Sequence, residues 1–72
     1  MVLRNRLRVH RAMLNVNPQE MGRLCCVSRQ TISLIERGDY SPSVTLALTI
    51  AKVCGASVEE IFYLQEGTEH EE

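Results

Sequence analysis

The sequence has few aromatic residues, no long apolar run and only three cysteines, and each shortage excludes a class of protein. Aromatic residues make up 4% of the chain and tryptophan is absent, so we expect a core of aliphatic side chains, as in packed helices. No apolar stretch reaches the ~20 residues that a membrane-spanning helix needs. The charged N-terminus also lacks the apolar segment of a signal peptide. These absences predict a cytoplasmic protein with no membrane partner.

The cysteines do not follow the pattern of a disulfide framework or a metal site. Cys25 and Cys26 are adjacent and Cys54 is distant, which fits reduced thiols better than a set of bridges. A vicinal pair permits a redox or metal-sensing role, but His10 and His70 have no ligand spacing relative to it. We therefore expect the cysteines to pack as small apolar side chains, with no metal or other cofactor.

Charge is divided unevenly along the chain, although its net value is only -1. Residues 1–38 carry seven arginines and two glutamates, whereas residues 39–72 carry one lysine and seven acidic residues. A basic half can meet an anionic partner while the acidic half orients the protein as it approaches. The sequence shows no acid pair, no nucleophile with a base and no glycine-rich phosphate loop, so we predict no enzyme and no small-molecule ligand.

A chain of 72 residues forms one domain with a small core, and such domains often dimerise. Local signals predict five helices and no strand. Capping residues open the second, third and fifth of them at Asn17, Ser28 and Ser57, and glycines end the third and fourth at Gly38 and Gly55. The expected helices span residues 3–14, 18–25, 28–37, 43–54 and 57 to about 64.

The segment 17–38 is the centre of the prediction, because it contains two short helices joined by a tight turn. In its second helix, Ile32 and Ile35 share one face, and polar residues share another. That polar face consists of Arg29, Gln30, Ser33 and Arg37. The turn needs one residue in the left-handed conformation, where glycine is preferred, and Cys26 stands there at a cost of ~1 kcal/mol.

The segment 27–38, Val-Ser-Arg-Gln-Thr-Ile-Ser-Leu-Ile-Glu-Arg-Gly, resembles the helix-turn-helix of phage-repressor-like transcriptional regulators, the XRE or Cro/cI type. The resemblance covers about residues 5–64. It implies an all-α fold, a compact five-helix lambda-repressor-like DNA-binding domain that acts as a homodimer on double-stranded DNA. Three residues depart from the family pattern, namely Pro18, Gly22 and Cys26, and all three concern the second helix and the turn.

The resemblance also assigns roles to individual residues. The implied base contacts are Arg29, Gln30, Ser33 and Leu34, and the implied phosphate contacts are Gln19, Ser28, Thr31, Arg37, Tyr40 and Ser43. An ion pair between Arg11 and Glu36 is expected to join the first and third helices. We place the dimer interface on the fifth helix, at Phe62, Tyr63 and Leu64.

These observations predict a DNA-binding domain over residues 1–66 and an acidic flexible tail over residues 67–72. The predicted function is sequence-specific binding of a two-fold operator, most simply as a repressor, with the third helix in the major groove. The alternative is an antitoxin-like or adaptor module that uses the same fold to bind a protein partner.

Overall fold

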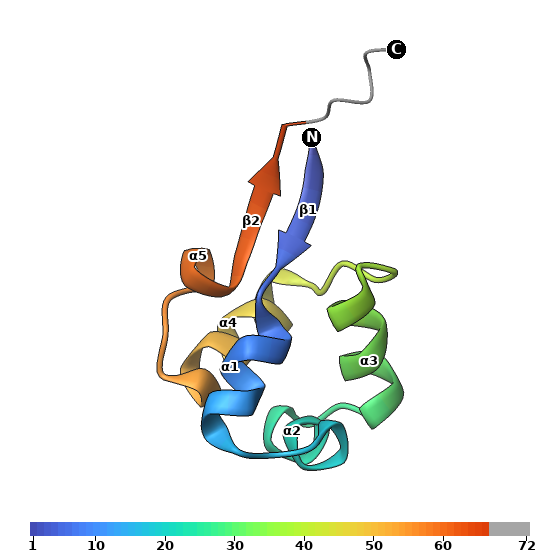
Figure 1. Cartoon of the computed structure of the whole chain (residues 1–72). Helices are drawn as coiled ribbons and strands as arrows, with labels where there is room; N and C mark the ends of the chain where they lie inside the picture. The colour runs from blue at the N-terminus through green and yellow to red at the C-terminus, as the bar shows by residue number, and fades with distance from the viewer. Residues whose placement is uncertain (67–72) are drawn as a thin grey trace.

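A computed structural model describes residues 1–66, which form five helices and a two-stranded sheet (Figure 1). The predicted acidic tail, residues 67–72, lies outside the described residues. Within residues 1–66, no helix has the length and apolar character needed to cross a membrane. The elements are β1 (Val2–Asn5), α1 (Leu7–Leu14), α2 (Pro18–Cys25), α3 (Arg29–Arg37), α4 (Val44–Cys54), α5 (Val58–Ile61) and β2 (Phe62–Gln65).

Helices α2, α3 and α4 begin and end close to the predicted residues because each has a side-chain cap. Asn17 accepts a hydrogen bond from the Glu20 amide at 2.8 Å, Ser28 accepts one from Thr31 at 3.2 Å, and Ser43 accepts one from Leu46 at 3.1 Å. A capping box, in which the acid three residues on returns a hydrogen bond to the cap, is only half formed at Asn17, since the Glu20 carboxylate binds Arg23 instead. The box at Ser57 is complete.

The five predicted helices are present, but the fold is not strictly all-α, because the two ends of the described chain pair as an antiparallel ribbon. Leu3 lies opposite Leu64, and Asn5 lies opposite Phe62. Figure 1 shows this ribbon projecting from the helical body. Residues 3–5, which we expected in the first helix, belong to β1 instead. Arg6 precedes α1, and its amide donates to the Ile61 carbonyl at 2.7 Å.

The core lies between the helices and is mainly aliphatic, as the composition predicts. Its fully buried side chains include Leu7, Met21, Ile32, Ile35, Ile50 and Ile61. Phe62 joins this core and is only 7% exposed, so its prediction as a dimer contact is wrong. Tyr63 and Leu64 are exposed on β2 rather than on a fifth helix, which ends at Ile61.

Candidate nucleic-acid interface

Helix α2 approaches the turn before α3 at a distance that only glycine permits. A Cβ atom added at Gly22 would lie 2.6 Å from the Val27 carbonyl oxygen, closer than side chains tolerate. The Val27 amide in turn donates to the Gly22 carbonyl at 2.8 Å. The departure from the family pattern at Gly22 therefore has a structural reason: it allows the close contact that sets α3 against α2.

The turn itself contains Cys26 in the left-handed conformation, with φ of 64°, as the sequence predicts. Its amide donates to the Arg23 carbonyl at 3.3 Å. Cys25 is buried, and burial raises the pKa of its thiol, as it does for Cys54. Cys25 therefore packs as an apolar group, as expected, whereas that expectation is wrong for the exposed Cys26.

Within residues 1–66, no group of three or more His, Cys, Asp or Glu side chains is arranged to hold a metal ion.

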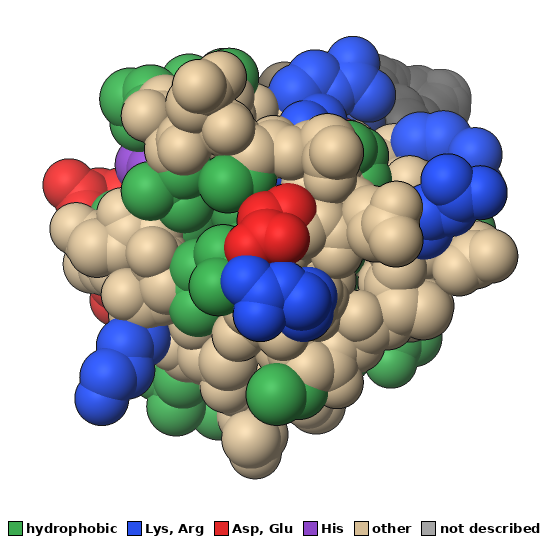
Figure 2. Space-filling view, turned by 90° about the horizontal axis from the view of Figure 1, so that it is seen from below, with side chains coloured by type: hydrophobic (Ala, Val, Ile, Leu, Met, Phe, Trp, Pro, Cys, Tyr) green, Lys and Arg blue, Asp and Glu red, His purple; other side chains and the backbone are tan. Residues whose placement is uncertain are grey.

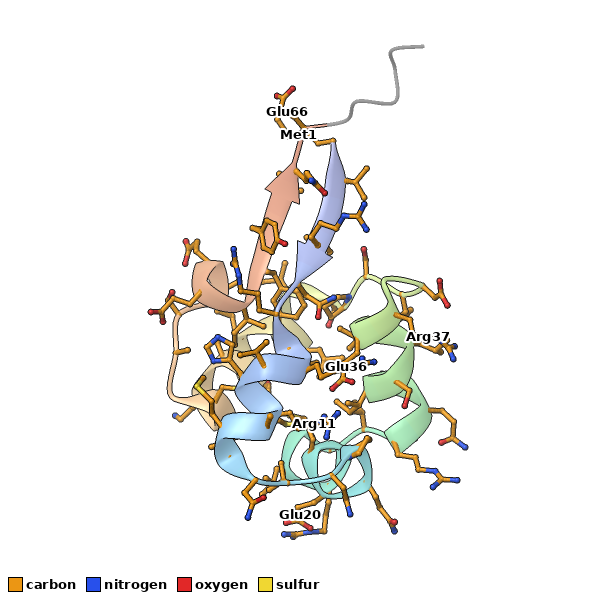
Figure 3. All side chains as sticks on the ribbon, in the orientation of Figure 1. Met1, Arg11, Glu20, Glu36, Arg37 and Glu66 are labelled. Atoms are coloured by element: carbon orange, nitrogen blue, oxygen red, sulfur yellow. The ribbon has the colours of Figure 1, made fainter. Side chains whose placement is uncertain are left out.

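The inner side of α3 fixes the helix to the body through apolar contacts and through ion pairs of Glu36 with Arg11 and, at 3.5 Å, with the exposed Arg8. Ile32 and Ile35 are buried in the core. Beside them, Glu36 accepts hydrogen bonds from Arg11, with the Nε–Oε2 distance 2.6 Å and the Nη2–Oε1 distance 3.3 Å. Figure 3 shows these two side chains pointing toward each other between α1 and α3. The side chains of Arg11 and Glu36 are 16% and 4% exposed, so the pair is shielded from water.

Three further hydrogen bonds strengthen this junction, and sequence reasoning missed all of them. Arg11 also donates to the Val16 carbonyl at 3.0 Å, which ties the end of α1 to the same pair. The Asn5 amide donates to the Ile35 carbonyl at 2.8 Å, and its oxygen accepts from the Leu7 amide. No local signal identifies Asn5, because its partner lies 30 residues away.

The outer side of α3 carries the polar residues that the sequence singled out. Arg29 and Gln30 are exposed in its first turn, and Arg37 is exposed at its end. Figure 3 shows Arg37 pointing away from the body. Within residues 1–66, Arg29 and Gln30 have no side-chain hydrogen bond or ion pair. A shallow hollow on this side is lined by Arg29, Gln30, Ser33, Leu34 and Arg37, which include all four predicted base contacts.

A second hollow brings two helix N-termini together. It is lined by Asn17 and Gln19 from the start of α2 and by Ser28 and Arg29 from the start of α3. Helix N-termini carry partial positive charge and unpaired N–H groups, so they attract phosphate. Glu20 also lines this hollow, but its carboxylate is occupied by Arg23, which lowers the pKa of Glu20.

The remaining predicted phosphate contacts have mixed surroundings. Thr31 lies half-buried next to Ser28, with their hydroxyl oxygens 3.1 Å apart. Arg37 pairs with Asp39 at 3.2 Å on the surface, which is a weak interaction in water. Tyr40 is exposed in the segment between α3 and α4, and Ser43 caps α4.

Positive charge gathers on the side of the molecule where α3 lies. In the view from below, Lys and Arg side chains lie along the upper right edge, which is the side of α3 in Figure 1, with no acidic side chain in view beside them (Figure 2). Other Lys and Arg side chains lie at the centre, against acidic ones, and at the lower left. The face on which the polar residues of α3 lie is therefore also a basic face.

A family model described as helix-turn-helix matches residues 7–61. The chain belongs to the helix-turn-helix family. The predicted resemblance to the XRE, phage-repressor-like type is thereby confirmed, and the family is one of DNA-binding transcriptional regulators rather than of enzymes. The matched segment contains all five helices and neither strand, so the ribbon lies outside the part that matches the family.

Named relatives and a solved structure agree with this assignment. The chain is 41% identical over 64 residues to an HTH-type transcriptional regulator of Methanocaldococcus jannaschii, covering 89% of this chain and 97% of the relative. It is 38% identical over 64 residues to the HTH-type regulator YgzD of Bacillus subtilis, with the same coverage. The structure is similar to the P22 c2 repressor in complex with a synthetic operator, with a TM-score of 0.73 and 28% identity over 75% of this chain and 82% of that one.

Proposed function

We propose that this helix-turn-helix protein binds a two-fold DNA site as a homodimer, with α3 of each copy in the major groove, and represses transcription by occupying that site. The observation that carries the proposal is the outer side of α3, where Arg29 and Gln30 are exposed and have no partner within residues 1–66. The P22 c2 repressor supports it, since that protein is bound to an operator in its structure.

The side chains on this face match the chemistry of base edges. The major groove presents paired acceptors on guanine and an acceptor beside a donor on adenine. Arg29 suits the first pattern and Gln30 the second, and each bidentate contact discriminates against other bases by ~1–3 kcal/mol. Ser33 can donate or accept, and Leu34 can pack on the methyl group of thymine.

Phosphate contacts are proposed at both ends of α3. The hollow at the starts of α2 and α3 offers Gln19, Ser28 and Thr31 to one strand. At the other end, Arg37, Tyr40 and Ser43 are available to the backbone. Ser28 and Ser43 accept a backbone N–H as caps. The hydroxyl proton of Ser43 can donate to phosphate, whereas the Ser28 hydroxyl shares a hydrogen bond with that of Thr31, so one of these two hydroxyls can donate.

Two copies are required to explain a two-fold site. The two α3 helices must then lie one turn of DNA apart, ~34 Å. We also propose a cytoplasmic localisation. The relatives come from an archaeon and a bacterium, and in such cells the DNA lies in the cytoplasm.

Selection of bound sequences from random duplex DNA tests the proposal. We expect enrichment of a sequence with two-fold symmetry, and an affinity for it that falls steeply as salt rises, because arginine–phosphate contacts release counterions. Failure to enrich any sequence, or binding that does not respond to salt, contradicts the proposal. Capture of a protein partner from nuclease-treated lysate, in the absence of DNA binding, supports the adaptor alternative instead.

A further inference from the structure

We infer that the β1–β2 ribbon forms a second DNA-contacting surface, on which Arg4 binds a phosphate of the duplex beyond the bases that α3 contacts. The inference rests on the proposed function. It extends that function to a part of the chain that the helix-turn-helix match, residues 7–61, does not include.

The arginines of the chain fall into two groups, according to whether they bind a carboxylate. Four of the seven pair with an acidic side chain, namely Arg8, Arg11, Arg23 and Arg37. Within residues 1–66, the other three have no such partner. One of these is Arg29 on the outer side of α3, and the other two are Arg4 in β1 and Arg6 just after it. Unpaired positive charge is therefore found at α3 and at the ribbon.

One face of the ribbon brings Arg4 and Arg6 together with two polar side chains. Side chains alternate between the faces of a strand, so Arg4 shares a face with Tyr63, which lies directly opposite, and with Gln65. The Arg6 guanidinium carbon lies 4.2 Å from the centre of the Tyr63 ring, so Arg6 is engaged in a cation–π contact. Arg4 is exposed, and its Nε donates to Gln65 Oε1 at 2.7 Å.

This hydrogen bond prepares Arg4 for a phosphate. Gln65 holds the guanidinium at Nε, and within residues 1–66 the two Nη groups of Arg4 make no hydrogen bond. The edge formed by two guanidinium nitrogens matches two phosphate oxygens, which accept parallel hydrogen bonds from it. Arg4 is therefore oriented by its neighbour and still has donors for an anion.

A hollow connects Arg4 to the end of α3. It is lined by Leu3, Arg4 and Tyr63 from the ribbon and by Arg37 and Gly38 from the end of α3. Figure 1 shows β1 on the side of the ribbon where α3 lies. Arg37 is the proposed phosphate contact at this end of α3, so Arg4 continues the same row of positive charge.

Two acidic residues lie near this hollow, and neither offers it a free charge. Glu36 lines the hollow, but its side chain is only 4% exposed and accepts from Arg11 at 2.6 Å. Asp39 pairs with Arg37 on the surface, where such a pair is weak. The hollow therefore suits an anion.

The DNA backbone is the anion that fits a row of this kind. Each strand of a duplex presents one phosphate per about 3.4 Å along the helix axis. A strand that passes Arg37 thus offers further phosphates in the direction of Arg4. A contact of this kind positions the protein and raises affinity without selecting bases.

Affinity of the full chain for the selected DNA site tests the inference. For Arg4→Ala we expect at least ~3-fold weaker binding and a salt slope lower by about 1 for each copy bound, with unchanged base preference. Lys52→Ala, which removes the same charge, is the control. Lys52 is exposed on α4 and lines none of the hollows around α3. Its variant should bind within about twofold of the wild type, because a distant exposed charge is screened by salt.

Gln65→Glu separates a lost phosphate contact from a damaged ribbon. The substitution keeps Arg4 and replaces the amide oxygen that accepts from its Nε by a carboxylate, so Arg4 gains an ion pair. We expect weaker DNA binding, as for Arg4→Ala, but no loss of stability in urea unfolding. This variant also lowers the net charge by one, so Lys52→Ala serves as its control.

Ethylation of single phosphates in the selected site locates the contact. With the wild type, ethylation of at least one phosphate outside those flanking the groove that α3 occupies should weaken binding. With Arg4→Ala, the same ethylation should have no effect. The inference is overturned if that phosphate stays sensitive with Arg4→Ala, or if Arg4→Ala and Gln65→Glu bind as tightly as Lys52→Ala. Selective binding that depends on Arg29 would survive both results, whereas failure to select any DNA site contradicts the proposed function itself.

Discussion

The two sides of α3 use the same kinds of side chain for opposite purposes. On the inner side, Arg11 and Glu36 form a shielded ion pair, so their hydrogen-bonding groups are occupied within the protein. On the outer side, Arg29 is exposed and has no partner within residues 1–66. Arg11, which is paired within the protein, stabilises the fold, whereas the exposed Arg29 is available to bind DNA. We therefore expect substitutions on the inner side of α3 to lower stability and substitutions on its outer side to lower DNA affinity.

The largest effect is expected from Glu36→Gln. The substitution leaves Arg11 without its carboxylate in a poorly solvated position, at a cost of about 3 kcal/mol in the free energy of unfolding. For a domain of this size that corresponds to a fall of about 12 °C or more in the thermal midpoint. Glu59→Gln, at an exposed position, is the control and should leave the midpoint unchanged. An unchanged midpoint for Glu36→Gln would mean that the pair is only a surface contact.

Gly22→Ala should also act through stability, by about 1–3 kcal/mol. The new Cβ would meet the Val27 carbonyl oxygen at 2.6 Å, so α2 or the turn must move. Urea unfolding measures the loss. Gly55→Ala is a useful comparison, because nothing lies within 4 Å of its added Cβ and its strain comes from the backbone alone. A stabilised Gly22→Ala protein would show that α2 can shift freely.

On the outer side, Arg29→Ala should change the free energy of unfolding by no more than about 0.5 kcal/mol, since the side chain contacts no other polar group within residues 1–66. Its affinity for the selected site should fall by ~1–3 kcal/mol, with relaxed preference at one base position. Arg37→Ala should instead weaken binding to all sequences and lower the salt slope by about 1. If both variants lost sequence preference equally, Arg29 and Arg37 could not be assigned to base and phosphate contacts respectively.

The smallest effect is expected at the turn. Cys26→Gly should raise stability by about 1 kcal/mol, because glycine adopts the left-handed conformation without strain. DNA affinity should not change, since Cys26 lines none of the hollows along α3. Chemical denaturation gives the first quantity and fluorescence anisotropy the second. A destabilised variant would show that the Cys26 side chain contributes contacts that outweigh the strain.

The sequence predicted α2, α3 and α4 well because their boundaries depend on local chemistry. Asn17, Ser28 and Ser43 are cap residues whose partners lie three residues away, and Gly38 stops α3 within the same short range. The ion pair of Arg11 with Glu36 was also expected, but only through the family resemblance, since 25 residues separate them.

The ribbon could not be predicted in the same way, because it joins residues about 60 positions apart. Phe62 follows Val58 at helical spacing, so the local pattern favoured a longer fifth helix, and the pairing with β1 overrides it. Val44 shows a related limit. Helical period groups Val44 with Ala51 on one side of α4, yet Val44 is exposed and Ala51 is buried, because the period does not tell which residues of a helix side other elements cover.

The most direct test is a double-mutant cycle between Arg29 and the guanine that it is expected to contact. Affinities are measured for the wild type and Arg29→Ala, each on the selected site and on a site in which that guanine is replaced. If Arg29 contacts the guanine, each single change costs ~1–3 kcal/mol and the two together cost little more than one. Losses that add in full would show that the outer side of α3 does not contact that base.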